Sequence, residues 1–298
     1  MVSEWEQEWE RNVIKNWEER WRGVLGFGYD DLRPEAATGI RVRVFTEDKL
    51  DNEMNLQSYG GELYMRPGQH DILFYNNDTE YIVFDGEESL VTATASTRTR
   101  TRSTYNGRNG DERTVNAPDQ LYAAFLPDYT AVESLEMTDL PVQMRPLTYK
   151  YVVHFMFKSG LQYVALARGA LAGMAEGVFL HSGETTEEPA TILFDDCIVD
   201  QDLGAYAIVY SFGVPGEVRI PEVPHEGHTF MLNLEVMLKN GKIVSFDFDV
   251  TDQVSSQPRG GIIVVDNIEI DDADGALGGG FDVDVDGWGD YEDIELPL

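Results

Sequence analysis

Short runs in which apolar and polar residues alternate dominate the chain. In GIRVRVF (residues 39–45), aliphatic side chains alternate with arginines, so a strand places the two kinds on opposite faces. Further apolar runs follow, separated by Gly, Pro, Asn and Asp: GELYM, HDILFY, YIVF, YKYVVHFMF, QYVALARG, GVFLHS, ATILFDDCIV, AYAIVYSFG, TFMLNLEVML, KIVSFDFDV and GIIVVDNIEI. Many short strands with turn residues between them predict an all-β protein built of β-sandwiches.

The strand pattern stops and restarts near the middle of the chain. The segment LPVQMRP carries two prolines and precedes a long apolar strand. The chain has 298 residues, of which 42% are hydrophobic, and this length suits two domains. We therefore expect two β-sandwich domains, residues 1–145 and 146–298, that meet near residues 141–148 and contain little helix beyond the N-terminal segment.

The first half contains the stretch GGELYMRPGQHDILFYNNDTEYIVF (residues 60–84), which is typical of a meander of hairpins. The turn signal RPGQ links GELYM to HDILFY, and NNDTE links HDILFY to YIVF. Asn and Asp tolerate positive φ and bond to neighbouring backbone groups. We predict that NNDTE is a hairpin loop rather than a ligand site.

A basic stretch follows, in which threonine alternates first with alanine and then with Arg98, Arg100 and Arg102. The pattern indicates a strand that turns into a polar edge, because charged side chains discourage edge-to-edge pairing. These arginines can also bind a carboxylate, but we favour the solvated edge. The next segment, YNGRNGDERTVNAPDQ, has the composition of an exposed loop.

The N-terminal segment departs from the strand pattern. Large apolar residues recur there at every fourth position: Trp5, Trp9, Val13, Trp17 and Trp21. This spacing places them on one helical face, and Ser3 with Glu6 has the spacing of a capping box. All of them also occupy odd positions, so a strand would gather them on one face too. We predict a short helix over residues 10–21, with an extended segment as the alternative.

The C-terminal segment DVDVDGWGDYED has the spacing of a calcium loop. Positions one, three, five, six, nine and twelve of such a loop are filled by Asp282, Asp284, Asp286, Gly287, Asp290 and Asp293. However, the last position lacks the usual glutamate, and Gly289 stands where an aliphatic residue is usual. Val283 and Val285 also alternate with the aspartates as they would in a strand. We predict a closing strand with these valines buried, and no metal site.

Candidate catalytic groups are scattered along the chain. Cys197 lies in an apolar run and is predicted to be a small buried residue; as the one cysteine of the chain, it excludes an internal disulfide. His225 and His228 flank Glu226 in a Pro/Gly-rich turn rather than on a zinc-binding helix. We therefore predict no enzyme: no catalytic residue, no metal ligand, no cofactor, and no cleft that gathers His154, His181, His225 or His228 with a carboxylate.

The charge of the chain limits its partners. The formal net charge is −32, which repels phosphate backbones and anionic lipid, so we expect no nucleic acid and no electrostatic membrane binding. No apolar run is long enough to span a bilayer, and MVSEW does not read as a secretion signal. We expect a soluble chain as given, and MVSEW is also compatible with a precursor from which a leader or a lipid anchor has been removed.

Several phrases of the sequence are shared with a known family: LYMRPGQHDILFYNNDTEYIVF, TASTRTRTRS, LARGALAGMAEGVFLHSG, FDFDVTDQV and GGFDVDVDGW. From about residue 39 to its end, the chain resembles the fimbrillin-like surface lipoproteins of Bacteroidales, in an uncharacterised branch of the fimbrillin/Mfa-like superfamily. The resemblance implies two transthyretin-like β-sandwich domains, export through a lipoprotein leader, and a structural or adhesive role in a pilus at the outer membrane and cell surface.

The resemblance also implies partners. These are other pilus or surface-protein subunits, joined by strand addition, and a host or glycan ligand; the membrane would be reached only through a lipid anchor on the precursor. Shaft, tip and anchor roles stay open. The alternatives are a carbohydrate-binding module on the same scaffold and a calcium-stabilised adhesin. An exposed row of aromatic rings would favour sugar binding, and an open sheet groove would favour subunit assembly.

Overall fold

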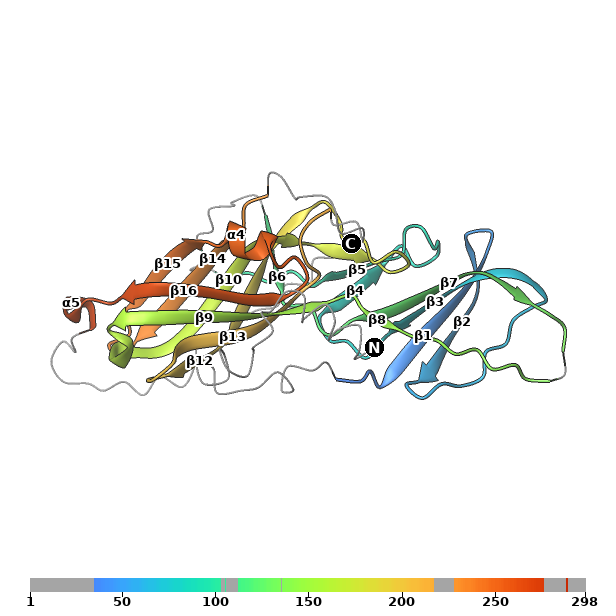
Figure 1. Ribbon diagram of the computed structural model, residues 1–298, viewed down its shortest axis with the longest axis horizontal. Coiled ribbons are helices and arrows are strands. Elements are labelled where there is room, and N and C mark those ends of the chain that lie inside the picture. Colours follow the sequence, from blue (N-terminus) through green and yellow to red (C-terminus); the bar gives the residue numbers. More distant parts are fainter. Residues whose placement is uncertain are drawn as a thin grey trace.

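Strands form most of the regular structure (Figure 1), so the predicted all-β class is confirmed. The computed structural model describes residues 35–102, 105, 112–134, 136–216, 228–275 and 288. Its helices in these ranges are short: η2 (Leu161–Tyr163), a 3₁₀ helix, α4 (Thr251–Ser255) and α5 (Asp272–Gly275). Within the same ranges, no helix has the length and apolar character needed to cross a membrane.

The first lobe is a sandwich of two sheets. Its larger sheet has the order β2-β1-β3-β7-β8, and the smaller has the order β11-β5-β4. A core of apolar side chains lies between them, with Phe45, Leu73 and Tyr75 fully buried. The strands are β1 (Gly39–Thr46), β2 (Lys49–Gln57), β3 (Gly68–Asn76), β4 (Ile82–Asp85), β5 (Thr94–Thr97), β7 (Tyr122–Ala131), β8 (Arg145–Pro146) and β11 (Gly177–Phe179).

The second lobe is built on a sheet of order β15-β14-β10-β12-β13-β9-β16, with β6 paired to β12. The long β12 pairs with β10 over most of its length and with β13 over its last three residues. Side chains from both parts of the sheet pack into one core, so the sheet folds over on itself. The strands are β6 (Arg113–Asn116), β9 (Tyr149–Ser159), β10 (Val164–Ala175), β12 (Pro189–Asp200), β13 (Gly204–Ser211), β14 (Met231–Leu238), β15 (Ile243–Asp249) and β16 (Gly261–Glu269).

The two lobes lie along the long axis of the molecule and exchange strands (Figure 1). β11 comes from the second half of the chain but pairs antiparallel with β5 of the first lobe. In return, β6 comes from the first half and pairs parallel with β12. The division at residues 145 and 146 stays a prediction, and the pairing adds that the two halves are interleaved.

The predicted meander of hairpins is wrong in two places. Residues 61–65 do not form a strand, and β3 pairs with β1 and β7 instead of a strand just before it. The NNDTE segment is not a hairpin loop either, because β3 lies in the larger sheet and β4 pairs with β5 in the smaller one. A sandwich requires the chain to cross between sheets, and turn composition alone does not distinguish such a crossing from a hairpin.

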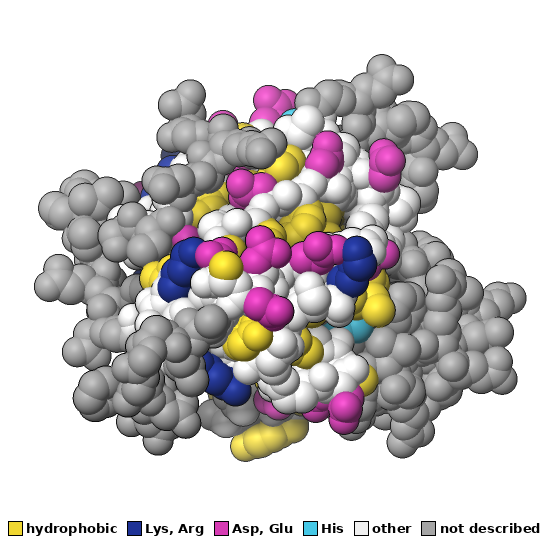
Figure 2. Space-filling view, turned by 90° about the vertical axis from the view of Figure 1, so that its left-hand side faces the viewer, with side chains coloured by type: hydrophobic (Ala, Val, Ile, Leu, Met, Phe, Trp, Pro, Cys, Tyr) yellow, Lys and Arg dark blue, Asp and Glu magenta, His cyan; other side chains and the backbone are white. Residues whose placement is uncertain are grey.

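The end of the second lobe carries many acidic side chains (Figure 2). Asp271 and Asp272, next to and within α5, are exposed there. This agrees with the strongly negative net charge of −32 and keeps anionic surfaces away from this end.

Candidate functional site

The connection between β3 and β4 uses its polar side chains to bind the protein itself. Asp78 accepts hydrogen bonds from the backbone N–H and the hydroxyl of Thr38, at 2.6 and 2.9 Å. Asn76 donates to the carbonyl oxygen of Gln120 at 2.9 Å and accepts from the N–H of Tyr122 at 2.6 Å. These contacts tie the connection to the start of β1 and the start of β7.

Asp119 completes this arrangement from the opposite side. One of its carboxylate oxygens accepts hydrogen bonds from three successive backbone N–H groups, those of Glu80, Tyr81 and Ile82, at 2.8, 2.6 and 3.2 Å. Successive N–H groups that converge in this way form a concave anion site. Here the anion is a side chain of the protein itself. Asn76 and Asp78 of NNDTE likewise bind groups of the protein, at the point where the chain crosses from one sheet to the other.

In the basic stretch after β5, Arg98 is solvent-exposed, as predicted, but Arg100 is half-buried and Arg102 is buried. The backbone of the stretch is held between β4 and β6, since the N–H of Arg98 donates to Tyr81 at 3.0 Å and that of Arg100 donates to Thr114 at 2.9 Å. Because β6 pairs with β12, the stretch is carried onto the second lobe. Only 1% of the Arg102 side chain is exposed there. The alternating charges do suggest a sheet edge, but they do not show that β6 and β12 continue the structure beyond it and that Arg102 is buried there.

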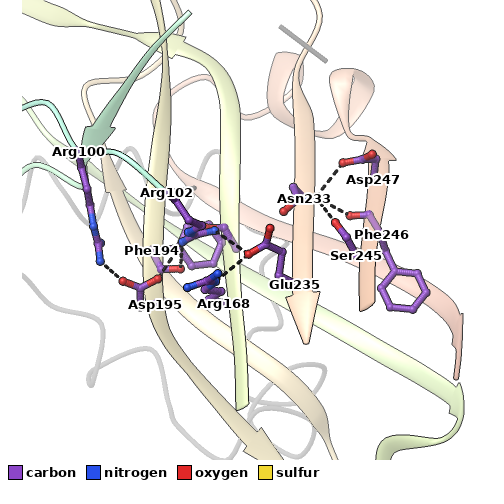
Figure 3. A network of polar contacts seen from close by, with 11 residues as sticks. Arg100, Arg102, Arg168, Phe194, Asp195, Asn233, Glu235, Ser245, Phe246 and Asp247 are labelled. Carbon is purple, nitrogen blue, oxygen red and sulfur yellow. Dashed lines mark hydrogen bonds and ion pairs between the residues drawn. The ribbon is translucent and has the colours of Figure 1, made fainter. Parts of the chain in front are cut away.

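Arg102 is the centre of a buried polar network on the second lobe (Figure 3). Its Nη2 donates to Oδ1 of Asp195 at 2.8 Å and to the carbonyl oxygens of Gly169 and Phe194 at 3.1 and 3.2 Å. Arg100 binds the other carboxylate oxygen of Asp195. A single carboxylate of β12 therefore holds two arginines that come from the first half of the chain.

The network extends across β10 and β14. Nε of Arg168 donates to Glu235 at 2.7 Å, and these side chains are only 4% and 2% exposed. Nη1 of Arg102 lies 3.9 Å from the same carboxylate oxygen of Glu235. The guanidinium carbon of Arg168 also lies 3.8 Å from the ring centroid of Trp288, a cation–π contact. Arg168 thus connects a buried carboxylate to an aromatic ring.

The residues of this network fit a structural role. Its cations are guanidinium groups, which stay protonated at any physiological pH, so they do not serve as general acids or bases. Buried ion pairs are strongly coupled to stability, since the removal of one partner leaves a buried charge uncompensated. The arrangement is therefore suited to fixing the crossing segment in place.

An acid-lined cleft of about 700 Å³ opens in the first lobe. Arg43 lies at its wall and bonds with Glu53 at 2.8 Å and Glu87 at 3.1 Å. Nε of Arg43 also donates to the hydroxyl of Tyr75 at 3.0 Å. Burial raises the pKa of Tyr75, and the hydrogen bond to Glu87 raises it further. The lining residues are Arg43, Leu50, Glu53, Phe84, Asp85, Gly86, Glu87, Glu88, Ser89 and Thr92.

The remaining candidates from the sequence lie in separate places. His154 on β9 is fully buried, and its Nε2 donates to the carbonyl oxygen of Leu203 at 2.6 Å. His181 follows β11 and contacts Phe125 edge to face, with ring centroids 6.0 Å apart. Cys197 is partly buried and packs against the core of the second lobe. The absence of a catalytic site stays a prediction.

The described residues offer neither a cluster of metal ligands nor a row of exposed aromatic rings. In those ranges, no group of three or more His, Cys, Asp and Glu side chains is arranged to hold a metal ion. The large aromatic side chains that are exposed in the same ranges are Tyr59 and Tyr64, which are 89% and 67% exposed and lie in one connection after β2. His225, Glu226, the N-terminal tryptophan row and the C-terminal aspartates lie outside the described residues.

The comparisons with known proteins point to fimbrial relatives. In an alignment 302 positions long, the chain is 26% identical to a Bacteroides ovatus protein named as a candidate fimbrium anchoring subunit, Fim4B. The alignment covers 91% of this chain and 88% of that protein. The crystal structure of a candidate adhesin from Bacteroides ovatus ATCC 8483 matches with a TM-score of 0.54 at 21% identity, covering 82% of this chain and 91% of that one.

A further solved structure is the fimbrial anchor protein Mfa2 from Porphyromonas gingivalis. It matches with a TM-score of 0.47 and 11% identity, over 78% of this chain and 83% of that one. At the level of sequence, residues 12–195 match the family described as a domain of unknown function, DUF5119. Because this match spans more than half of the chain, the protein belongs to the DUF5119 family.

Proposed function

We propose that the protein is a non-enzymatic, fimbrillin-like subunit of a cell-surface fimbria, and that it acts in fimbrial anchoring. The observation that carries the proposal is the alignment with the candidate fimbrium anchoring subunit. It extends over 91% of this chain and 88% of that protein, so the likeness is not confined to one lobe. The shared fold of the candidate adhesin, at a TM-score of 0.54, supports the same assignment.

The proposed location is the outer membrane and cell surface, with a lipid anchor on the precursor. With a net charge of −32, the chain is repelled by anionic lipid. Attachment to a membrane therefore needs a covalent lipid or a protein partner rather than a basic patch.

The proposed partners are other fimbrial subunits, joined by addition of a strand to a sheet edge. In the described part of the sheet order, β2 ends the larger sheet of the first lobe and β15 ends the sheet of the second lobe. Exposed and half-buried side chains alternate along both strands. An added strand would continue this alternation, with every second side chain on the same face of the sheet. We also propose that the sandwiches correspond to domains 1–145 and 146–298, interleaved through β6 and β11.

Gene deletion in the source organism, followed by cell fractionation, tests the proposal. The major fimbrial subunit should move from the cell-bound fraction to the culture medium in the deletion strain and return on complementation. In the wild type, protease added to intact cells should cleave this protein. Full protection from protease would refute the surface location. Fimbriae that keep their amount and attachment in the deletion strain would refute the anchoring role.

A further inference from the structure

Strand β16 ends the sheet of the second lobe among the described residues. On one side it pairs in parallel with β9, with Ile262 beside Val152 and Val264 beside His154. On the other side lies α4 with the turn that follows it. An edge strand presents unpaired N–H and C=O groups that attract further strands, and native proteins cover or distort such edges.

Two glutamines of this helical segment bind the outer edge of β16. Oε1 of Gln257 accepts from the N–H of Ile262 at 2.9 Å, and its Nε2 donates to the C=O of Ile262 at 3.0 Å. Gln253 makes the same pair of bonds with Val264, both at 2.9 Å. Each side-chain amide thus offers one acceptor and one donor to one residue of the strand, as the backbone of a neighbouring strand would.

The spacing of the glutamines fits the spacing of the strand. Residues four apart in a helix are separated by about 6 Å along its axis, and residues two apart in a strand are separated by about 6.6 Å. Gln253 lies in α4, and Gln257 lies in the turn after it, where its N–H donates to the carbonyl oxygen of Val254 at 2.9 Å. The two glutamines are four residues apart, and Ile262 and Val264 are two apart. The two side-chain amides therefore match the spacing of Ile262 and Val264, the residues of β16 to which they bond.

The glutamines are held in place by their surroundings. Val254, between them, is fully buried in the core of the second lobe. The hydroxyl of Tyr151 donates to the carbonyl oxygen of Gln257 at 2.7 Å. Gly261 leaves the space that the Gln257 amide fills, since a Cβ at Gly261 would lie 2.0 Å from Oε1 of Gln257. The packing of this part of the lobe thus holds both glutamines against β16.

The rest of the edge is protected by other means. The pairing register of β16 with β9 shifts between Val265 and Ile268, and Asn267 has a left-handed φ of 60°. Asp266 and Glu269 are exposed. A bulge and charged side chains both discourage the addition of a strand, so the exposed half of the edge is also unsuited to pairing.

We propose that α4 and its following turn are an edge seal, in which Gln253 and Gln257 keep a second copy of this chain from pairing with β16. The segment GIIVVD at the start of β16 is apolar, β-branched and nearly uncharged, which is the composition that pairs with itself when exposed. The inference goes beyond the proposed function, since it removes this edge from the surfaces open to strand addition and holds whatever the fimbrial role.

Amide hydrogen exchange on the double variant Gln253→Ala/Gln257→Ala tests the seal. The N–H groups of Ile262 and Val264 should exchange at least about tenfold faster than in the wild type, because each loses a hydrogen bond. The N–H groups of β9 and β13 serve as internal references and should keep their rates. In sedimentation velocity, the variant should form dimers or larger species as its concentration rises, while the wild type should not.

A matched control and a second variant make the test decisive. Gln162→Ala/Gln201→Ala removes two exposed glutamines elsewhere and should leave exchange and association unchanged. Gly261→Ala keeps both glutamines but places a methyl group where Gln257 lies, so exchange should rise at Ile262 more than at Val264. Unchanged exchange in both test variants would overturn the seal. Faster exchange with the same concentration dependence as the wild type would overturn its role against self-pairing.

Discussion

Replacement of Arg102 by alanine should lower the free energy of unfolding far more than the loss of a surface ion pair does. The side chain is 1% exposed and donates to Asp195 and to two backbone carbonyl oxygens at 2.8–3.2 Å. Loss of one partner of a buried pair costs ~3–5 kcal/mol. Asp195 keeps Arg100 and is 16% exposed, so we expect the lower end, ~3 kcal/mol.

Urea unfolding measures this free energy directly, and a thermal scan should show a midpoint lower by about 6 °C, at ~2 °C per kcal/mol for a chain of this size. Arg113→Ala is the matched control. Arg113 also pairs with a carboxylate, that of Glu176, but is 58% exposed, so its loss should cost less than ~1 kcal/mol. Equal effects of the two substitutions would show that burial does not set the strength of these pairs.

The lysine variant separates charge from geometry. Arg102→Lys keeps the positive charge but lacks the planar fork that reaches several acceptors at once. We expect it to recover only part of the lost stability. A lysine variant as stable as the wild type would mean that charge alone accounts for the role of Arg102, and that the carbonyl contacts with Gly169 and Phe194 contribute nothing measurable.

Three further predictions concern other parts of the fold. Asp119→Ala removes the acceptor of three N–H groups and should cost ~2 kcal/mol and speed amide exchange at residues 80–82; unchanged exchange there would contradict it. Burial holds the pKa of His154 below its ordinary value of 6.5, so the unfolded chain takes up protons first and stability falls as the pH drops below 6.5. In His154→Gln this part of the pH dependence of urea unfolding should vanish, and an unchanged slope would refute it. Gly204 has φ 98°, and a Cβ there would lie 2.3 Å from the carbonyl oxygen of Phe155, whereas Gly241 has φ 81° and open space. Gly204→Ala should therefore lower the thermal midpoint several degrees more than Gly241→Ala, and equal shifts would show that the close approach is relieved at no cost.

The sequence predicts well which side chains of a strand share a face. In β1, Val42 and Val44 lie in one apolar cluster, whereas Arg43 and Phe45 lie on the opposite face; the alternation did not reveal that both faces are buried. The signal is reliable there because alternate side chains of a strand face opposite environments. The predicted resemblance to fimbrillin-like proteins also agrees with the relatives found.

The elements that the sequence does not predict depend on distant partners. β6 and β11 have only four and three residues, too few for a period to be recognised. Arg102 meets Asp195 across 93 residues, and no local pattern encodes that contact. The glutamine seal did leave a local trace, since Gln253 and Gln257 have the spacing of one helical turn. However, α4 spans five residues and has no side-chain cap, so neither its start nor its length is signalled.

The same distant contacts connect the fold to the proposed anchoring role. An anchor is held at one end and loaded at the other, so its lobes must not slide past each other. β6 and β11 each place a strand of one half of the chain in the sheet of the other half. Arg100 and Arg102 then fasten the segment before β6 to β12. Separation of the lobes therefore requires the loss of two strand pairings and a buried ion-pair network together, whereas two sandwiches joined by a simple linker would part at the linker alone.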